Sequence, residues 1–374
     1  MKIKSKKYPL NEFLKRKRIL SIIINSVFSL FFFIIRKINW LFSFRDGHVV
    51  VIALHRLGDT IFSIPAVSKI IERYGSKTII VCFSTSVPIY KLAFTDVEFC
   101  TVERSDFFFN ERIANFKIKQ KLRALKPYII LDISGTMISS SLIFNMRARK
   151  IIGINGKLFR MIYDQFVLYR EKPKLVDIYL DAISPVIQIR DRNKLYCQSI
   201  ALNPNGKILI HPYAGWKEKE WNFRKFFILA EKLSESFDVC IIAPTNYIDT
   251  DIIQEIMYSP INIIQTKSSD ELIQAIKECA IFIGNDSGPI NIANFLGKPT
   301  VTIFGATNPD YTASDYDFQK YTQVTLECSA REKEKYCLIG ADAYHCPGLQ
   351  CMNLLTLDEV YKNVLPLINK YCSK

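Results

Sequence analysis

Three short stretches of the 374-residue chain combine residue types that can do chemistry on a charged substrate. Asp59 ends the segment Arg56-Leu57-Gly58-Asp59, which follows an apolar run, and its carboxylate could accept a proton. Lys219 lies in a charged loop and could stabilise negative charge on a departing group. Asp286 lies in Gly284-Asn285-Asp286-Ser287-Gly288-Pro289, a turn rich in small and polar residues.

The last of these stretches predicts a strand, a tight turn, a helix and a second strand. Ser287 or Gly288 suits the cap of the helix, and Pro289 suits its first position, where a missing N–H costs nothing. Free N–H groups and the positive end of the helix dipole favour an anion there. The residues alone leave open whether this is a phosphate site or an ordinary turn between strand and helix.

The sequences of four segments, and their order along the chain, resemble those of glycosyltransferase family 9, the heptosyltransferases that build lipopolysaccharide. The donor-binding segment of that family is similar to IFIGNDSGPINIANFLGKPTVTIFGATNP, residues 281–309. The other three matches are VVIALHRLGDTIFSIP at 50–65, ILIHPYAGWKEKEWNFRKF at 208–226 and CMNLLTLDEV at 351–360. The resemblance covers roughly residues 47 to 370.

The resemblance implies a role for each candidate residue. Asp59 would be the general base, although an aspartate at the start of a helix is also a common cap, and one side chain can do both. Lys219 would bind the donor phosphates. Arg56 would hold a phosphate or carboxylate of the acceptor, unless it is simply a surface arginine. The donor contacts would come from Asp286, Ser287, Gly288, Pro289 and Asn291. The family often has histidine at the position of Asn291, and asparagine cannot carry positive charge, so the donor or the rate could differ.

No metal site and no cofactor are expected, because the resembled enzymes use a helix dipole and a lysine where others use a metal. Asp249-Thr250-Asp251 has the letters of a metal motif but is better explained as helix capping.

The ten cysteines include no Cys-x-x-Cys pair. We predict buried thiols for Cys82, Cys100, Cys197, Cys240 and Cys279. Cys328, Cys337, Cys346 and Cys351 leave a disulfide or an adventitious metal open, at spacings unlike the usual zinc patterns.

Positive charge is concentrated at the start of the chain. Residues 1–45 hold eleven Lys or Arg and one Glu, which is +10 of the net +14. This distribution favours an anionic membrane surface over nucleic acid as the partner.

The apolar run Ile19–Ile35 spans about 25 Å as a helix, less than the ~30 Å hydrocarbon core. A helix lying in the interface, a spanning helix and a helix buried in the protein are the three possibilities, and the first is favoured. In a helix that lies in the interface, one polar stripe would face water, formed by Arg18, Ser21, Asn25, Ser29 and Arg36. No signal-peptide cleavage site is expected.

Alternating strand and helix patterns from Val49 onward predict an α/β protein. We expect strands at 49–54, 78–83, 129–133, 150–154, 208–211, 239–243, 261–265, 281–284 and 300–304, and helices at 60–74, 223–234, 270–279 and 357–371. Breaks at Tyr169–Pro173 and Ala201–Gly206 divide the chain. The expected parts are a membrane-associating segment (1–45), an acceptor domain (46–200), a nucleotide-sugar domain (201–355) and a C-terminal helix (356–374). The resemblance implies the GT-B architecture, two doubly wound Rossmann-like domains facing across a cleft, with the last helix returning toward the first domain.

The predicted activity is inverting transfer of a sugar, heptose from ADP-heptose, to a lipid-linked glycan at the cytoplasmic face of a bacterial inner membrane. Two alternatives remain at this point. One is a different nucleotide sugar, such as a UDP-hexosamine. The other is a non-catalytic module that binds nucleotide or glycan at the membrane.

Overall fold

The computed structural model describes residues 30–108, 112–154, 160–170, 174–190, 200–245, 259–332, 334–337, 346 and 348–373. Three predictions fall outside these ranges: most of the apolar run Ile19–Ile35, the buried thiol of Cys197, and the capping role of Asp249–Asp251.

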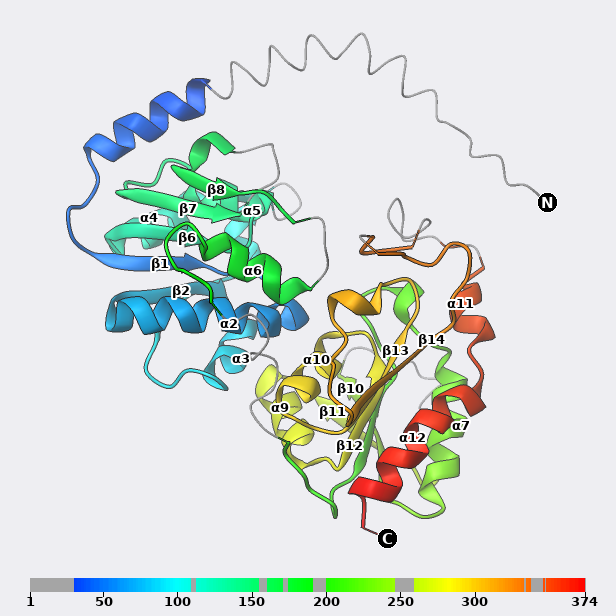
Figure 1. Cartoon of the computed structure of the whole chain (residues 1–374). Coiled ribbons are helices and arrows are strands. Elements are labelled where there is room, and N and C mark those ends of the chain that lie inside the picture. The colour runs from blue at the N-terminus through cyan, green and yellow to red at the C-terminus, as the bar shows by residue number, and fades with distance from the viewer. Residues whose placement is uncertain are drawn as a thin grey trace.

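The first half of the chain folds around a six-stranded parallel sheet (Figure 1). Its strands are β1 (His48–Ile52), β2 (Thr78–Phe83), β3 (Glu98–Val102), β6 (Pro127–Asp132), β7 (Lys150–Ile154) and β8 (Gln165–Val167), in the order β3-β2-β1-β6-β7-β8. Val50 of β1 pairs with Ile79 on one side and Ile130 on the other, so β1 is a central strand. Residues 49–52 are all apolar and buried, and because successive side chains point to opposite faces, β1 is apolar on both faces. Such a strand needs helices on both faces of its sheet.

The helices between these strands or after them, in the part of the chain that the structure describes, are α2 (Leu57–Tyr74), α3 (Val87–Lys91), α4 (Phe116–Ala124), α5 (Met137–Ile143) and α6 (Leu175–Ile183). A short hairpin of β4 (Phe107–Phe108) and β5 (Ile113–Ala114) precedes α4. The helix α2 matters most for the site, because it begins directly after β1 at the carboxyl edge of the sheet. Arg56 occupies its N-cap position and Asp59 its third helical position, so Asp59 is not the N-cap residue.

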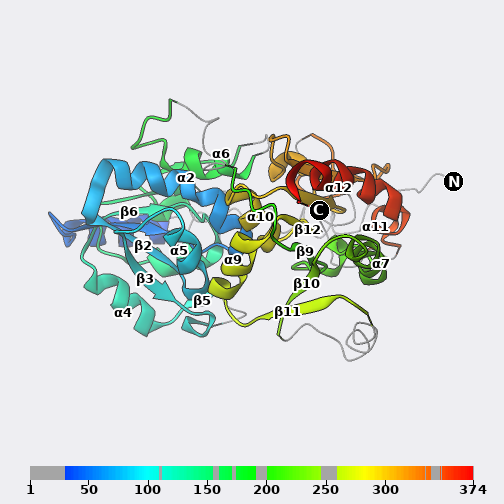
Figure 2. The same ribbon diagram turned by 90° about the horizontal axis from the view of Figure 1, so that it is seen from below.

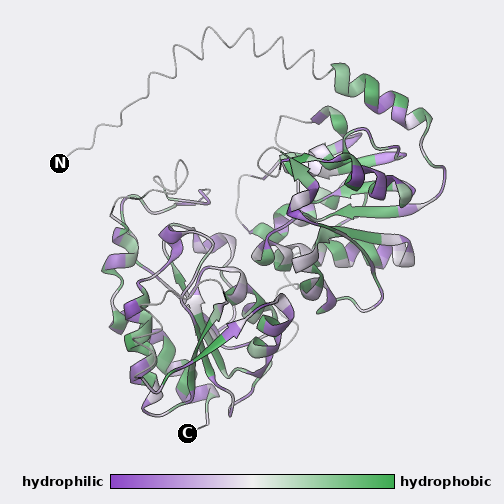
Figure 3. Ribbon diagram, turned by 180° about the vertical axis from the view of Figure 1, so that it is seen from behind, coloured by the Kyte–Doolittle hydropathy of each residue, from purple (hydrophilic) through white to green (hydrophobic). Residues whose placement is uncertain are grey.

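The second half repeats the arrangement with β9 (Ile208–His211), β10 (Val239–Pro244), β11 (Asn262–Thr266), β12 (Ile281–Asn285), β13 (Thr300–Phe304) and β14 (Gln319–Gln323). The order β11-β10-β9-β12-β13-β14 is again that of a doubly wound sheet, all parallel. Its helices are α7 (Phe223–Ser234), α9 (Ser269–Glu278), α10 (Gly288–Phe295), α11 (Gln350–Leu354) and α12 (Leu357–Tyr371). Figure 3 shows the strands of both sheets as mostly hydrophobic, which agrees with their burial.

The two halves meet where α2 of the first lies against α10 of the second, and α3 also approaches α9 (Figures 1 and 2). One cluster of buried apolar side chains runs continuously through this contact, from the face of the first sheet to that of the second. Ser269 Oγ adds a hydrogen bond of 3.1 Å to the Thr85 carbonyl across the same boundary. Both halves are therefore held in one packed body.

Several sequence predictions are corrected at the ends of the chain. The helix α12 does not return to the first half but packs on α7 and β12 to β14 of the second. A helix over residues 30–41 packs on the first half, and Arg36 is buried there instead of facing water. Within the described ranges, no helix combines the length and apolar character required to cross a membrane.

Candidate active site

A cavity of about 160 Å³ lies between the carboxyl edges of the two sheets. Seven of the eight residues predicted for the site line it: Arg56, Asp59, Lys219, Asp286, Ser287, Gly288 and Asn291. Pro289 is the exception, because it occupies the second position of α10 and does not line the cavity. The crevice at the carboxyl edges is where doubly wound sheets bind their ligands.

Two helix N-termini converge on this cavity. Gly58 of α2 and Gly288 of α10 approach so closely that a Cβ added to Gly58 would lie 3.4 Å from Gly288 Cα. A Cβ added to Gly288 would lie 3.0 Å from Leu57 Cβ. Glycine at both positions therefore lets the two positive dipole ends face the same space, which favours an anion between them.

The N-cap of α10 is Ser287, as the sequence suggested, but its side chain makes no capping hydrogen bond. Its Oγ is buried and, within the described part of the chain, has no hydrogen-bond partner. A buried hydroxyl without a partner costs free energy, so it points to a ligand atom that completes it. A phosphate oxygen at the N-terminus of α10 would do so.

Lys219 and Asp286 form a largely buried ion pair, with Nζ and Oδ2 2.5 Å apart. Asp286 also accepts hydrogen bonds from Thr307 Oγ1 at 2.7 Å and from Thr312 Oγ1 at 3.4 Å. The loop that carries Lys219 is fixed by Glu220, whose Oε1 accepts from the Ala214 N–H at 3.0 Å. The ammonium group is thus held at one position at the edge of the cavity.

The carboxylate of Asp59 is recessed at the start of α2. Burial raises the pKa of Asp59 above its ordinary value, and Asp286 acts in the same direction. Lys335, Lys219 and Arg56 lower it again through their positive charge. A carboxylate with a raised pKa in a cleft is a stronger proton acceptor than one in water, provided that it remains ionised.

Lys335 was not predicted, because in the sequence it stands in an unremarkable charged run, Arg331–Lys335. The structure brings it to the cavity by fastening its segment to the loop after β13. The Asn308 N–H donates to the Lys335 carbonyl at 3.1 Å, and the Cys337 N–H donates to the Ala306 carbonyl at 2.8 Å. Thr307 and Tyr336 form an antiparallel bridge between the two segments.

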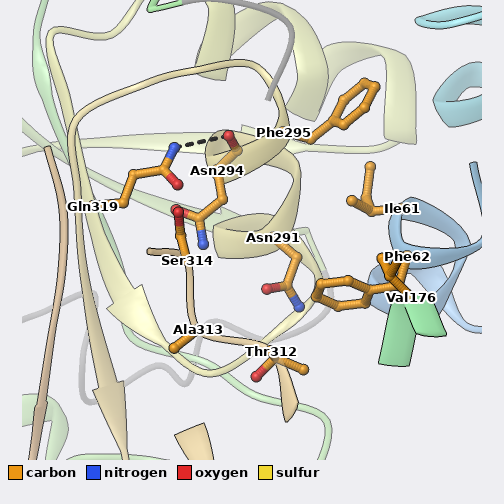
Figure 4. Close-up of a pocket in the computed structure, with 10 residues that line it drawn as sticks. All are labelled: Ile61, Phe62, Val176, Asn291, Asn294, Phe295, Thr312, Ala313, Ser314 and Gln319. Carbon is orange, nitrogen blue, oxygen red and sulfur yellow. Dashed lines mark hydrogen bonds between the residues drawn. The ribbon is translucent and has the colours of Figure 1, made fainter. Parts of the chain in front are cut away.

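Asn291 lies at the inner end of the cavity, beside the ring of Phe62 (Figure 4). A Cβ on Gly58 would lie 3.0 Å from its Nδ2, so the amide fills the space between α2 and α10. Behind it is a small hollow of about 20 Å³, closed on one side by the Gln319 amide, which donates to the Asn294 carbonyl at 2.8 Å. That volume holds about one water molecule and no sugar.

Two aromatic side chains beside the cleft have structural contacts. Trp221 is buried, packs edge-on against Phe226 and donates from Nε1 to the Leu355 carbonyl at 3.0 Å. Burial lowers the pKa of His211 to about 4, so it is neutral at physiological pH and is not a proton donor to a phosphate.

Within the described part of the chain, no disulfide joins the cysteines. Cys82, Cys100, Cys240 and Cys279 are buried, which confirms that prediction. Within the same ranges, no group of three or more His, Cys, Asp or Glu side chains is placed to hold a metal ion.

The model of glycosyltransferase family 9 (heptosyltransferase) matches residues 115–340, which is more than half of the chain. The chain belongs to glycosyltransferase family 9. It is therefore a glycosyltransferase, and its two parallel sheets are those of the GT-B architecture.

Solved structures of family 9 enzymes have the same fold. The family 9 glycosyltransferase from Veillonella parvula superimposes with a TM-score of 0.67 at 17% identity, over 87% of this chain and 97% of that one. The ADP-heptose heptosyltransferase II of E. coli gives 0.63 at 15% identity, over 86% and 99%. The E. coli heptosyltransferase WaaC, solved with ADP, gives 0.62 at 13% identity, over 86% and 99%.

A short match links the chain to one curated protein. It is 52% identical over 44 residues to lipopolysaccharide heptosyltransferase 1 of Campylobacter coli. The match spans 12% of this chain and 13% of the length of that relative.

Proposed function

We propose that this glycosyltransferase moves a heptose from ADP-heptose, with inversion, onto the glycan of a lipid-linked acceptor such as the core of lipopolysaccharide. The observation that carries the proposal is the convergence of two helix N-termini and three cations, Arg56, Lys219 and Lys335, on one cavity that also holds a recessed carboxylate. Such a site suits a diphosphate and a base on opposite sides of a reacting sugar.

In the proposed reaction, the Asp59 carboxylate takes the proton of the acceptor hydroxyl. The hydroxyl oxygen forms a bond to the anomeric carbon as the bond from that carbon to the donor diphosphate breaks. The leaving diphosphate takes the electron pair, and its charge is stabilised by Lys219, the Ser287 hydroxyl and the N–H groups at the start of α10.

The choice of ADP-heptose is supported by two solved relatives, which are an ADP-heptose heptosyltransferase and a heptosyltransferase with ADP bound. The presence of Asn291, where the family often has histidine, does not argue against ADP-heptose as the donor. Its amide fills the contact between α2 and α10, so its replacement of a frequent histidine is explained by packing as well as by donor choice.

Thermal unfolding of the full chain with ADP, UDP, GDP and CMP tests the donor. A ligand that binds only the folded state stabilises it by about 2.7 kcal/mol at a hundred times its Kd. We expect the midpoint to rise with ADP alone, and the rise to be smaller in Lys219→Met. The protein is then assayed with ADP-heptose for transfer of heptose to a lipid-linked acceptor. A rise with UDP alone would replace the donor, and ADP binding without transfer to any acceptor would favour the non-catalytic module.

A further inference from the structure

The helix over residues 30–41 is fastened to the first domain by two buried polar side chains, beside the ring of Phe32, which packs edge-on against Phe144. Arg36 is buried, donates from Nη2 to the Asp164 carboxylate, and also reaches the Arg149 carbonyl at 3.3 Å. Asn39 is buried as well and donates from Nδ2 to Asn145 Oδ1 at 2.8 Å. The helix is therefore held in one orientation by specific polar contacts between residues more than a hundred positions apart.

The opposite side of this helix is apolar and faces outward. The exposed apolar side chains of the helix and of the residue after it are Leu30, Phe31, Phe33, Ile34, Ile38, Leu41 and Phe42, each between 46% and 70% exposed. A helix on a soluble domain normally has the reverse arrangement, with its apolar side inward. Figure 3 shows the helix as mostly hydrophobic and projecting from the first domain. An apolar face of this size, held outward by polar anchors, indicates a binding surface.

Cations surround the apolar face. Lys37 and Arg147 lie over the rings of Phe33 and Phe42, at 5.4 and 5.7 Å, and Arg149 lies 4.0 Å from the centre of the Trp40 ring. On the adjacent helix α4, burial and the charge of Arg123 lower the pKa of Lys119. The carboxylate that touches the helix, Asp164, is already paired with Arg36. The surface thus has an excess of positive charge that an anion would relieve.

A cavity of about 370 Å³ opens beside the helix. Its lining includes Asn39, Phe44, Arg123 and Arg147. The Arg123 Nε is buried and, in the described part of the chain, has no hydrogen-bond partner, while its Nη2 donates to the Asn145 carbonyl at 3.3 Å. A guanidinium group with a free N–H beside a second arginine matches the geometry of a phosphate.

We propose that the outer face of helix 30–41 docks the protein on an anionic lipid bilayer, with the apolar side chains in the interface and a headgroup phosphate between Arg123 and Arg147. Apolar and aromatic side chains rimmed by Lys and Arg are the pattern that membrane interfaces select. The sequence just before the helix adds to the charge, because residues 1–29 hold eight Lys or Arg and one Glu. A second copy of the chain would instead bring like charges together, so lipid is the better complement.

The docking face and the active site lie at opposite edges of the first sheet. The residues that meet the helix, Asn145, Arg149 and Asp164, precede strands, whereas Arg56 and Asp59 follow one. The cleft is then open to a donor in solution, and a membrane-bound acceptor must extend along the first domain to reach it. This inference does not depend on which nucleotide sugar the cleft binds.

Vesicle sedimentation of the full chain tests the proposal, with phosphatidylcholine vesicles that contain or lack phosphatidylglycerol. Ile34, Ile38 and Leu41 changed together to Glu should weaken binding to the anionic vesicles by about a hundredfold, because three charges of the wrong sign enter the contact. Arg123→Gln with Arg147→Gln should weaken the same binding by about thirtyfold. The matched control places the same three charges on exposed apolar positions of the second domain, at Leu202, Ile228 and Leu354, and should bind as the unmodified chain does.

Three outcomes would overturn the assignment. Unchanged vesicle binding in the Ile34, Ile38 and Leu41 variant, with an unchanged melting temperature, would show that residues outside the helix bind the lipid. A dimer in sedimentation velocity without lipid, lost in that variant, would make the face a contact between copies. A rise in melting temperature with inorganic phosphate over potassium chloride of equal ionic strength, absent in the Arg123 and Arg147 variant, would make the cavity a site for free phosphate.

Discussion

Lys219 Nζ lies 2.5 Å from Asp286 Oδ2, so two residues predicted separately as donor contacts form an ion pair with each other. Both side chains are largely buried, and the two threonines beside Asp286 complete its hydrogen bonding. Because the oxygens of the Asp286 carboxylate already accept these hydrogen bonds, the carboxylate is better suited to orient the Lys219 side chain than to bind a sugar hydroxyl. A donor diphosphate would then share the Lys219 ammonium with Asp286.

The ion pair leads to a prediction for Asp286→Asn. The amide keeps the shape but not the charge that orients Lys219, so we expect the transfer rate to fall by about a hundredfold. The Kd for ADP should change less than tenfold, because Lys219 remains free to meet a phosphate. Calorimetric titration with ADP and steady-state kinetics measure the two effects, with Lys217→Met on the same loop as the control. If Asp286→Asn loses ADP as completely as Lys219→Met does, Asp286 contacts the donor directly.

For Asp59, a substitution that lowers activity should not lower stability. Asp59→Asn removes the proposed base and should lower kcat by between about a hundredfold and ten-thousandfold. Burial raises the pKa of Asp59 in the folded state, so the folded protein holds this proton more tightly than the unfolded chain does. Its contribution to stability is therefore present at low pH and is lost as the pH rises from the ordinary value of 3.8 through the folded pKa. At pH 7 the neutral asparagine should keep or raise the melting temperature.

The same pKa predicts the acid side of the pH profile. The kcat/KM of the unmodified enzyme should fall as the pH falls through the pKa of Asp59, at a pH above 3.8. Asp46→Asn, at an exposed position before β1, should leave the profile unchanged. Near-full turnover in a folded Asp59→Asn protein would remove Asp59 from the mechanism.

Most of the strands that the sequence predicted are buried on both faces of their sheets, and the edge strand β11 was also predicted, one residue from its observed ends. Thr78–Phe83 and Thr300–Phe304 have the predicted ends, because an uninterrupted apolar and β-branched run bounded by turns has few alternatives. The edge strands β3, β8 and β14 escaped prediction, since an edge strand needs less apolar surface. Glu98 and Gln165, which begin β3 and β8, are both exposed.

Long-range contacts account for the rest of the difference. Arg36 turns inward because Asp164 and the Arg149 carbonyl are there to receive it, and helical periodicity contains no information about partners so distant in the chain. Lys335 reaches the cleft only because its segment pairs with the loop after β13. The predicted cleft residues were found through the family resemblance, because Lys219 and Arg56 alone are ordinary charged residues.

Lys335 offers a test of electrostatics at the base. Its positive charge lowers the pKa of Asp59 more than any other neighbour does. Lys335→Met should therefore raise the pKa of Asp59 and shift the acid limb of kcat/KM to higher pH. It should also lower kcat, because one cation of the diphosphate site is lost. Lys320→Met, on β14 and partly exposed, is the matched control and should change neither. A lower kcat with an unmoved acid limb would mean that Lys335 acts on the donor and not on Asp59.

The close approach of α2 and α10 leads to a prediction about two glycines. Gly288→Ala would place its Cβ 3.0 Å from Leu57 Cβ, and Gly58→Ala would place its Cβ 3.0 Å from Asn291 Nδ2. Each change should cost about 1–3 kcal/mol of unfolding free energy, because it forces apart two helices that share one buried core. Gly215→Ala is the control for stability, since a Cβ there meets nothing within 4 Å. Urea unfolding measures the cost.

A double variant tests the origin of this cost. Adding Asn291→Ala to Gly58→Ala should restore part of the lost unfolding free energy, because it removes the Nδ2 atom that the new Cβ would contact. Adding it to Gly288→Ala should not. If Asn291→Ala relieved both changes equally, the strain would be spread over the whole contact between the domains and not confined to these two glycines.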